Sequence, residues 1–245
     1  MFPDFTILDI ALSALLFMWA GFVRSGLGFG GAALGLPFML FIYNQPLYWL
    51  PLIGAHLLFF SALTLRTRLN NVNWEYLKSS LYYIIPPALI GVFGLISLPN
   101  LWIVTFIYSI TLFYAVMWLL NKSIHSESAW IDRFLLIFGG YVAGTSLTGA
   151  PIMVAVYVRN VVQSQLRNTL FVLWFILVSI KMTTFAALGV DLNIMTALVL
   201  LPVAAIGHFI GLKTHDIILQ NDVLFKRVIG GMLMVVSGLA LWNIW

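Results

Sequence analysis

The sequence has few charged residues and no cysteine. Only 8% of its 245 residues are Asp, Glu, Lys or Arg, and its mean hydropathy is +1.04, whereas a soluble domain carries about 25% charged residues. The low charge argues against a soluble globule, because too little polar surface is available to cover one. The absence of cysteine excludes disulfides, thiolate metal sites and a cysteine nucleophile. The chain is therefore predicted to lie in a lipid bilayer.

Long apolar runs occupy most of the chain and predict transmembrane helices. Several runs approach the roughly 20 residues that cross about 30 Å of hydrocarbon as a helix. A membrane β-barrel is excluded, because its strands would be about 10 residues long with alternating polarity. The fold class is predicted to be all-α and polytopic, with one transmembrane domain over residues 1–245. The expected helical segments are 5–23, 28–43, 47–65, 77–97, 101–120, 131–147, 149–159, 168–188, 193–212 and 224–243.

Basic residues gather in four of the connections. By the positive-inside rule these connections face the cytoplasm, whereas connections without Lys or Arg face outside. The alternation places both termini outside, in the periplasm of a bacterial-type inner membrane, and gives the two halves of the chain opposite orientations. The net charge of +4 then reflects cytoplasmic loops and not nucleic acid. The basic connections are 66–78, 122–133, 159–167 and 213–227, and the uncharged or acidic ones are 44–46, 97–100 and 189–193.

The two halves also resemble each other in sequence. Residues 85–93, IPPALIGVF, share Pro, Ala, Ile, Gly and Phe at the same offsets with residues 201–209, LPVAAIGHF. In addition, Gly30 and Gly31 stand 119 positions before Gly149 and Ala150. We predict two inverted repeats of about five segments each, about 1–125 and 126–245. Hydropathy leaves open whether the first segments of each repeat are full spans or re-entrant hairpins.

Glycine and proline interrupt corresponding segments of both halves, which is a pointer to a transporter's binding site. Each interior glycine costs a helix about 1 kcal/mol relative to alanine, so the glycines within 26–35 predict a break near Phe29 and a new helix from about Gly31. Residues 148–151, TGAP, predict a second helix start, with Thr148 before it as a cap. Helix N-termini that face the membrane interior favour an anion. Alternatively, the small residues only allow close helix packing.

Three ionisable side chains are expected inside apolar segments: Arg24, Lys181 and His56. No Asp or Glu lies at a comparable depth, and a charge at the bilayer centre costs about 2.5 to 3.5 kcal/mol, so such groups are functional candidates. A basic set without a carboxylate favours an anionic substrate. The alternatives are snorkelling, bonding to backbone carbonyls, or a bond to a neighbouring helix. His208 is expected nearer the cytoplasmic end and is a weaker candidate.

These motifs resemble those of a known family. Residues 21–32, GFVRSGLGFGGA, followed by Pro37, resemble the first glycine-rich motif of the TauE/SafE sulfite exporter family, and residues 140–151, GYVAGTSLTGAP, are similar to its second copy. Residues 164–170, SQLRNTL, resemble the stretch that follows it. The second copy differs at Leu147 and Ala150, where the family commonly has glycine. The resemblance covers nearly the whole chain and implies transport of small anions, often sulfite, thiosulfate or organosulfonates.

We therefore predict a secondary transporter or permease for a small anion, working by alternating access at a midplane site. Export of a monoanion from an inside-negative cell gains about 2.3 kcal/mol per 100 mV, so only import would need a coupled ion. His56 is the candidate proton carrier, because the unperturbed histidine pKa is about 6.5. The expected partners are the anion, the bilayer and protons, with no cofactor, metal or nucleic acid. The predicted substrate-binding residues are Arg24, Gly28, Gly30, Gly31, Thr148, Gly149, Ala150, Pro151 and Lys181.

Two other functions are compatible with parts of the sequence. An intramembrane serine hydrolase would use Ser146 with a membrane histidine, but Leu147 stands where rhomboid-like proteases have glycine, and no acid or base is placed beside the serine. A non-transporting membrane subunit is the second, and the nearly loop-free sequence weighs against it. The prediction is accordingly a transporter and not an enzyme.

Overall fold

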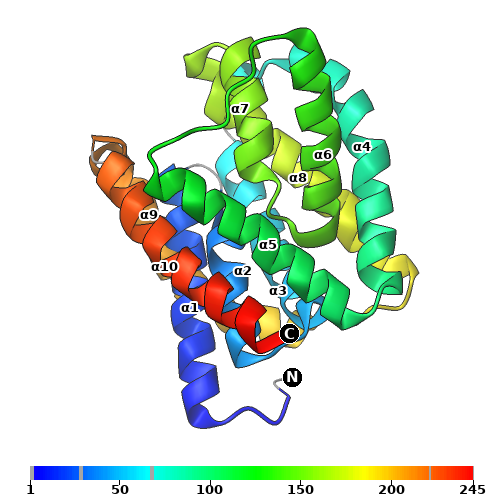
Figure 1. Cartoon of the computed structure of the whole chain (residues 1–245), viewed down its shortest axis with the longest axis vertical. Helices are drawn as coiled ribbons and strands as arrows, with labels where there is room; N and C mark the ends of the chain where they lie inside the picture. Colours follow the sequence, from blue (N-terminus) through cyan, green and yellow to red (C-terminus); the bar gives the residue numbers. More distant parts are fainter. Residues whose placement is uncertain (1–2, 28–29, 67–68, 221, 245) are drawn as a thin grey trace.

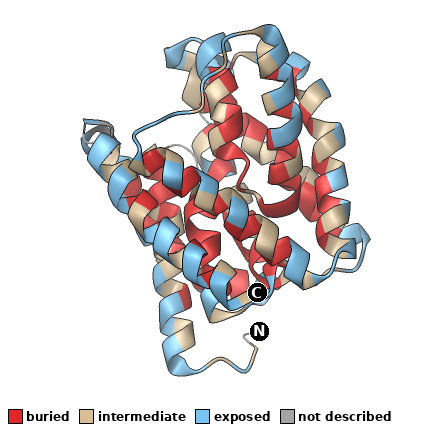
Figure 2. Cartoon of the chain, in the orientation of Figure 1, coloured by how far each residue is buried: buried red, intermediate tan, exposed pale blue. Residues whose placement is uncertain are grey.

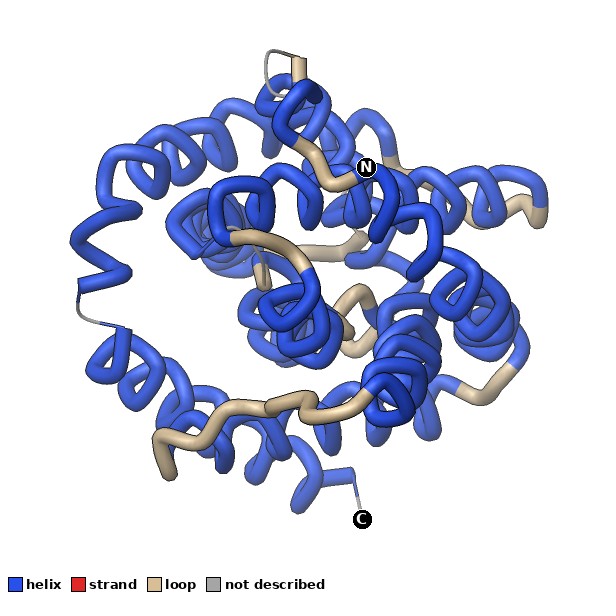
Figure 3. Tube along the Cα trace, turned by 90° about the horizontal axis from the view of Figure 1, so that it is seen from above, coloured by secondary structure: helices blue, strands red, loops and turns tan. Residues whose placement is uncertain are grey.

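The computed structural model describes residues 3–27, 30–66, 69–220 and 222–244. In this part of the chain all regular structure is helical, as Figure 3 shows. A short 3-10 turn, Leu69–Asn71, joins α3 to α4. The α-helices, labelled in Figure 1, are α1 (Ile7–Leu27), α2 (Gly31–Ile42), α3 (Pro46–Leu65), α4 (Trp74–Ser97), α5 (Asn100–Leu119), α6 (Ala129–Ser146), α7 (Ala150–Asn160), α8 (Gln163–Ala187), α9 (Ile194–Gln220) and α10 (Asp222–Ile244).

The helices confirm the predicted all-α, polytopic membrane protein. Seven of the described helices are long and apolar enough to cross a membrane. Two others are much shorter: α2 has 12 residues and α7 has 11, which at 1.5 Å per residue gives about 18 Å and 16 Å. Neither length crosses about 30 Å of hydrocarbon. The second helix of each half is thus a half-length helix that turns back from a break.

The two halves of the chain interlock. The largest helix contacts pair α1 with α9 and α4 with α6, so the first helix of each half packs against the fourth helix of the other. Glycines allow this close approach: a Cβ at Gly140 of α6 would lie 2.6 Å from the carbonyl oxygen of Ile84 on α4. The fifth helices, α5 and α10, also pair, as do the third helices, α3 and α8. This reciprocal pairing is the one expected of two related halves, and the repeat boundary near 125 stays a prediction.

Both termini lie at the same end of the molecule (Figure 1). We call it the terminal end and the opposite one the basic end. Helices α1 and α9 run in the same direction, and successive long helices alternate in direction. Four connections therefore lie at the basic end: α3–α4, α5–α6, α7–α8 and α9–α10. These four connections are the ones that the sequence analysis identified as basic.

Buried residues gather between the halves, and exposed residues cover the outer faces of the helices (Figure 2). Many of the exposed side chains are large and apolar, such as Tyr82, Trp130 and Trp242, which is the surface expected of helices that contact lipid. The interior also holds polar groups, including Arg24 and Lys181, which are 7% and 1% exposed.

Candidate functional site

The first helix break forms where α1 turns into α2. Helix α1 ends at Leu27, and α2 begins at Gly31, as predicted, after Gly30 in the left-handed conformation with φ 85°. A Cβ at Gly31 would lie 2.8 Å from the carbonyl oxygen of Ala20, so only glycine lets α2 begin this close to α1. Gly28, a predicted binding residue, and Phe29, where the break was expected, lie outside the described residues.

The second break forms where α6 turns into α7. Helix α6 ends at Ser146, Leu147 adopts a left-handed conformation with φ 59°, and α7 begins at Ala150 with proline in its first turn. The expected cap by Thr148 is wrong. Gly149 holds the N-cap position without a side-chain bond, and the Thr148 hydroxyl lies 2.6 Å from the Ser146 hydroxyl instead. The backbone N–H groups of this turn are therefore not covered by a capping side chain.

Both helix starts line one small cavity of about 30 Å³, which we call the central cavity. An α-helix leaves its first N–H groups without intrahelical partners and carries partial positive charge at this end. Two such ends thus converge on the same space, together with the Arg24 side chain. Its lining includes Arg24, Gly30, Gly31, Ala32, Leu57, Ser61, Ala143, Leu147, Ala150, Phe171, Trp174, Leu177 and Val178.

Arg24 supplies a full positive charge to this cavity. Its Nη2 lies 2.9 Å from Nδ1 of His208, its Nη1 lies 3.5 Å from the Ser61 hydroxyl, and the guanidinium carbon stands 5.0 Å from the centre of the Phe60 ring. Among the described residues Arg24 makes no ion pair with a carboxylate. A buried charge usually has an opposite partner, so an anion in the cavity would complete the site.

His56 lines a second small cavity of about 30 Å³, the side cavity, which Arg24 and Gly31 also line. Its Nε2 lies 2.7 Å from the carbonyl oxygen of Ala197 and donates to it, while Nδ1 is buried without a hydrogen-bond partner. The histidine thus anchors α3 to α9, as in the alternative interpretation, and keeps one nitrogen able to accept a proton beside Arg24.

Four of the predicted binding residues are not among those that line the central cavity, namely Thr148, Gly149, Pro151 and Lys181. The Lys181 ammonium donates to the carbonyl oxygens of Gly144 and Thr145, at 2.6 and 3.2 Å. These carbonyls end α6, where the helix dipole favours a cation, so Lys181 stabilises the turn into α7. Pro151 lines a separate cavity at the basic end.

Two contacts of Arg24 were not identified from the sequence, namely His208 and Ser61. His208 was expected near the cytoplasmic end because its segment was predicted to stop at 212. Helix α9 instead continues to Gln220, so His208 lies well inside the helix and beside Ser25, whose hydroxyl also contacts its Nδ1. One signal for His208 was available in the sequence: it directly follows Gly207, within the stretch that the two halves share.

Other chemistries find little support in this arrangement. Within the described part of the chain, no three His, Asp or Glu side chains come together as metal ligands. The Ser146 hydroxyl donates to the Val142 carbonyl at 3.0 Å and contacts Thr148. No histidine is among these contacts, so the site does not assemble a serine nucleophile with a base.

One of three comparisons with known proteins gave a match. A family model described as sulfite exporter TauE/SafE matches residues 13–240, which is nearly the whole chain. Comparison with curated proteins and with solved structures gave no match.

Proposed function

Because the chain belongs to the sulfite exporter TauE/SafE family, we propose that it carries a small sulfur oxyanion or organosulfonate across the membrane. The family assignment and the seven apolar helices establish a multi-pass membrane protein of the anion-permease type. The observation that carries the proposal is the convergence of two helix starts, at Gly31 and Ala150, on the cavity that Arg24 lines.

The proposed site holds the anion with one charged group and two sets of backbone donors. Arg24 presents a planar fork of N–H groups that matches an oxyanion, and the first turns of α2 and α7 add N–H groups and the positive ends of their dipoles. Much of the remaining wall is apolar, with Leu57 and Phe171, and Trp174 adds a buried indole N–H that has no hydrogen-bond partner among the described residues. Such a wall suits the organic group that is bonded to the sulfur of a sulfonate. It also strengthens the attraction between Arg24 and the anion, because it excludes water.

Transport would follow from a movement of one half of the protein against the other, with the anion between the two half-length helices. We place both termini in the periplasm and the basic end in the cytoplasm of an inner membrane. Export of a monoanion then runs down the membrane potential. For import, a proton on Nδ1 of His56 would offset the anion charge.

The test is thermal unfolding of the detergent-purified protein with a panel of anions. Ligand at 100 times its Kd stabilises a protein by about 2.7 kcal/mol, so sulfite, thiosulfate or an alkanesulfonate is expected to raise the Tm, and acetate to leave it unchanged. A chloride solution of equal ionic strength is the control. No rise with any sulfur anion, or an equal rise with acetate, would contradict the proposed substrate class.

A further inference from the structure

A third cavity opens at the basic end, and we call it the vestibule. It has a volume of about 320 Å³ and lies between α5, α7, the beginning of α10 and the α5–α6 connection. Four basic side chains line it: Lys122, His125, Arg159 and Lys226. A cleft lined by one sign of charge concentrates ions of the opposite sign, so the vestibule suits an anion.

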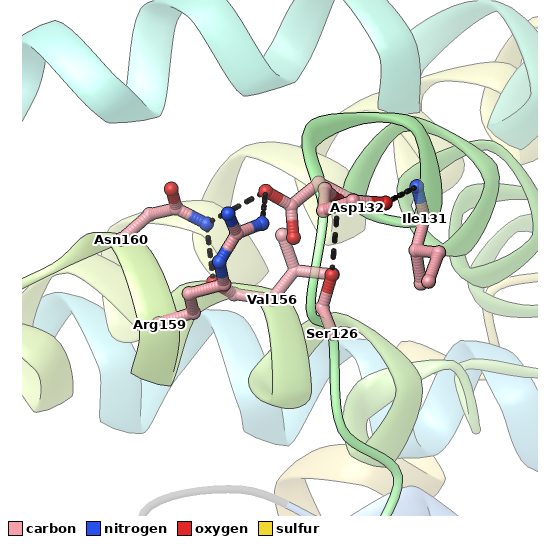
Figure 4. A network of polar contacts seen from close by, with 7 residues as sticks. Ser126, Ile131, Asp132, Val156, Arg159 and Asn160 are labelled. Carbon is pink, nitrogen blue, oxygen red and sulfur yellow. Dashed lines mark hydrogen bonds and ion pairs between the residues drawn. The ribbon is translucent and has the colours of Figure 1, made fainter.

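One of these groups, Arg159, is paired with the carboxylate of Asp132. Arg159 Nη1 lies 2.7 Å from Asp132 Oδ2, and Asn160 donates to the same oxygen at 3.1 Å (Figure 4). This network ties the last turn of α7 to the first turn of α6 and offsets the charge of Arg159. Lys122, which is exposed, contributes positive charge to the vestibule that this network does not offset.

The vestibule follows one face of α7 from Arg159 inward to Pro151. The residue before Pro151, Ala150, lines the central cavity, so the turn from α6 into α7 separates the two spaces. Tyr114 lines the vestibule at this wall and donates a hydrogen bond to the carbonyl oxygen of Thr148 at 3.1 Å. This contact ties α5 to the turn between α6 and α7.

The matching face of α2 is closed. Each residue of α7 corresponds to the residue of α2 that stands 119 positions earlier in the chain. Val158 therefore corresponds to Met39, and Ala155 corresponds to Leu36. Val158 is 58% exposed, whereas Met39 and Leu36 are both 0% exposed. Both helices pack mainly against the preceding and the following helix, α1 and α3 for α2 and α6 and α8 for α7, but α2 also packs against α5 and α10. The two half-length helices are thus in different environments, one open and one covered.

From this asymmetry we infer that the vestibule is the port through which the transported anion reaches the central cavity from the basic end, with the Tyr114–Thr148 contact as its inner gate. The inference rests on the proposed function and adds the route and its gate. In the opposite state of the transport cycle, the α2 face would open and the α7 face would close.

Single cysteines test the port directly, because the chain has none of its own. Ala155→Cys places a thiol in the vestibule, and Leu36→Cys places one at the corresponding covered position. A membrane-impermeant anionic maleimide is applied to vesicles of either orientation. We expect Ala155→Cys to react from one side only and about tenfold faster than Leu36→Cys, since thiolates form in water. Equal rates at the two positions, or no reaction at Ala155→Cys, would overturn the port.

The charge of the vestibule is tested with Lys122→Glu. At low salt we expect Ala155→Cys to react about 3- to 10-fold faster with the anionic maleimide than with a neutral one, and Lys122→Glu to abolish this preference. Lys78→Glu, on an exposed residue of α4 outside the vestibule, is the control and is expected to keep it. If Lys122→Glu keeps the preference for the anionic maleimide, the result would contradict a vestibule whose charge attracts anions.

Anionic lipid headgroups could also bind the basic groups of the vestibule, because they share the chemistry of the proposed ligand. Vesicles with and without an anionic lipid distinguish the two ligands. The labelling is run in phosphatidylcholine alone and with added phosphatidylglycerol. If Lys122→Glu abolishes the preference for the anionic maleimide in both kinds of vesicle, the result supports the port. If it does so only with phosphatidylglycerol, the basic groups bind lipid, which would overturn the port. Labelling needs no transport, so its result stands apart from the anion panel that tests the proposed function.

Discussion

Arg24 on α1 donates a hydrogen bond from Nη2 to Nδ1 of His208 on α9, at 2.9 Å. Because Nδ1 accepts this bond, the histidine ring is neutral in this arrangement and carries its proton on Nε2. The bond holds the guanidinium at the central cavity without cancelling its charge. It also joins the first helix of one half of the protein to the fourth helix of the other.

Replacing His208 is expected to disturb the position of Arg24. His208→Leu leaves a buried guanidinium without one of its acceptors, which costs about 1 to 3 kcal/mol, and should lower both the Tm and the affinity for sulfite. His208→Asn can place an amide oxygen near the position of Nδ1 and is expected to recover much of the loss. Melting curves with and without sulfite measure both effects, and identical curves for the two variants would argue against the positioning role.

Gly31→Ala is expected to abolish the stabilisation by sulfite. The added Cβ would meet the carbonyl oxygen of Ala20 at 2.8 Å and the Cβ of Arg24 at 3.1 Å, so the start of α2 must move away from α1. The control is Gly238→Ala on α10, where a Cβ meets nothing within 4 Å and a helical alanine is about 1 kcal/mol better than glycine. A sulfite-induced rise in Tm in Gly31→Ala equal to that of wild type would contradict the proposed role of α2.

Lys181→Met is expected to lower stability without removing anion recognition. The substitution keeps the apolar stem and removes the donor to the Gly144 and Thr145 carbonyls, at a cost of about 1 to 3 kcal/mol. The Tm should fall, while the order of preference among anions should stay that of wild type. A changed order with an unchanged Tm would instead place the Lys181 ammonium in the substrate site.

Leu147 combines an unfavourable backbone conformation with a place in the cavity wall. Its φ of 59° is one that leucine rarely adopts, and its side chain lines the central cavity. Leu147→Gly removes about 1 kcal/mol of backbone strain and enlarges the cavity, while Leu147→Ala enlarges the cavity and keeps the left-handed residue. We expect both variants to accept longer alkanesulfonates, with Leu147→Gly the more stable one in thermal unfolding. The reverse order of stability would contradict the strain at this position.

Hydropathy and glycine spacing predicted the helices well, because each helix in a bilayer must satisfy its own backbone. The start of α2 at Gly31 and the start of α7 beside Pro151 followed from local preferences alone. The pairing of α1 with α9 did not, since it depends on contacts between segments far apart in the sequence. His208 and Ser61 reach Arg24 only through such contacts.

The direction in which each side chain points could not be predicted from the sequence. Ala150 and Pro151 are neighbours, yet Ala150 lines the central cavity and Pro151 lines the vestibule. Lys181 is as deep as predicted, but its ammonium points to the end of α6. Depth can be inferred from the position within an apolar run, whereas the face that a residue presents depends on the packed bundle.

The most direct test of the account is sulfite flux into liposomes that contain wild type or Arg24→Ala protein. Arg24 supplies the full charge at the site, and charge-assisted hydrogen bonds contribute about 1.5 to 3 kcal/mol, so flux at low sulfite is expected to fall about tenfold or more. Arg24→Lys should restore part of it. Arg66→Ala, which removes an exposed arginine at the end of α3, should transport like wild type. Equal flux for wild type and Arg24→Ala would contradict the central claim that Arg24 and the two helix starts bind the anion.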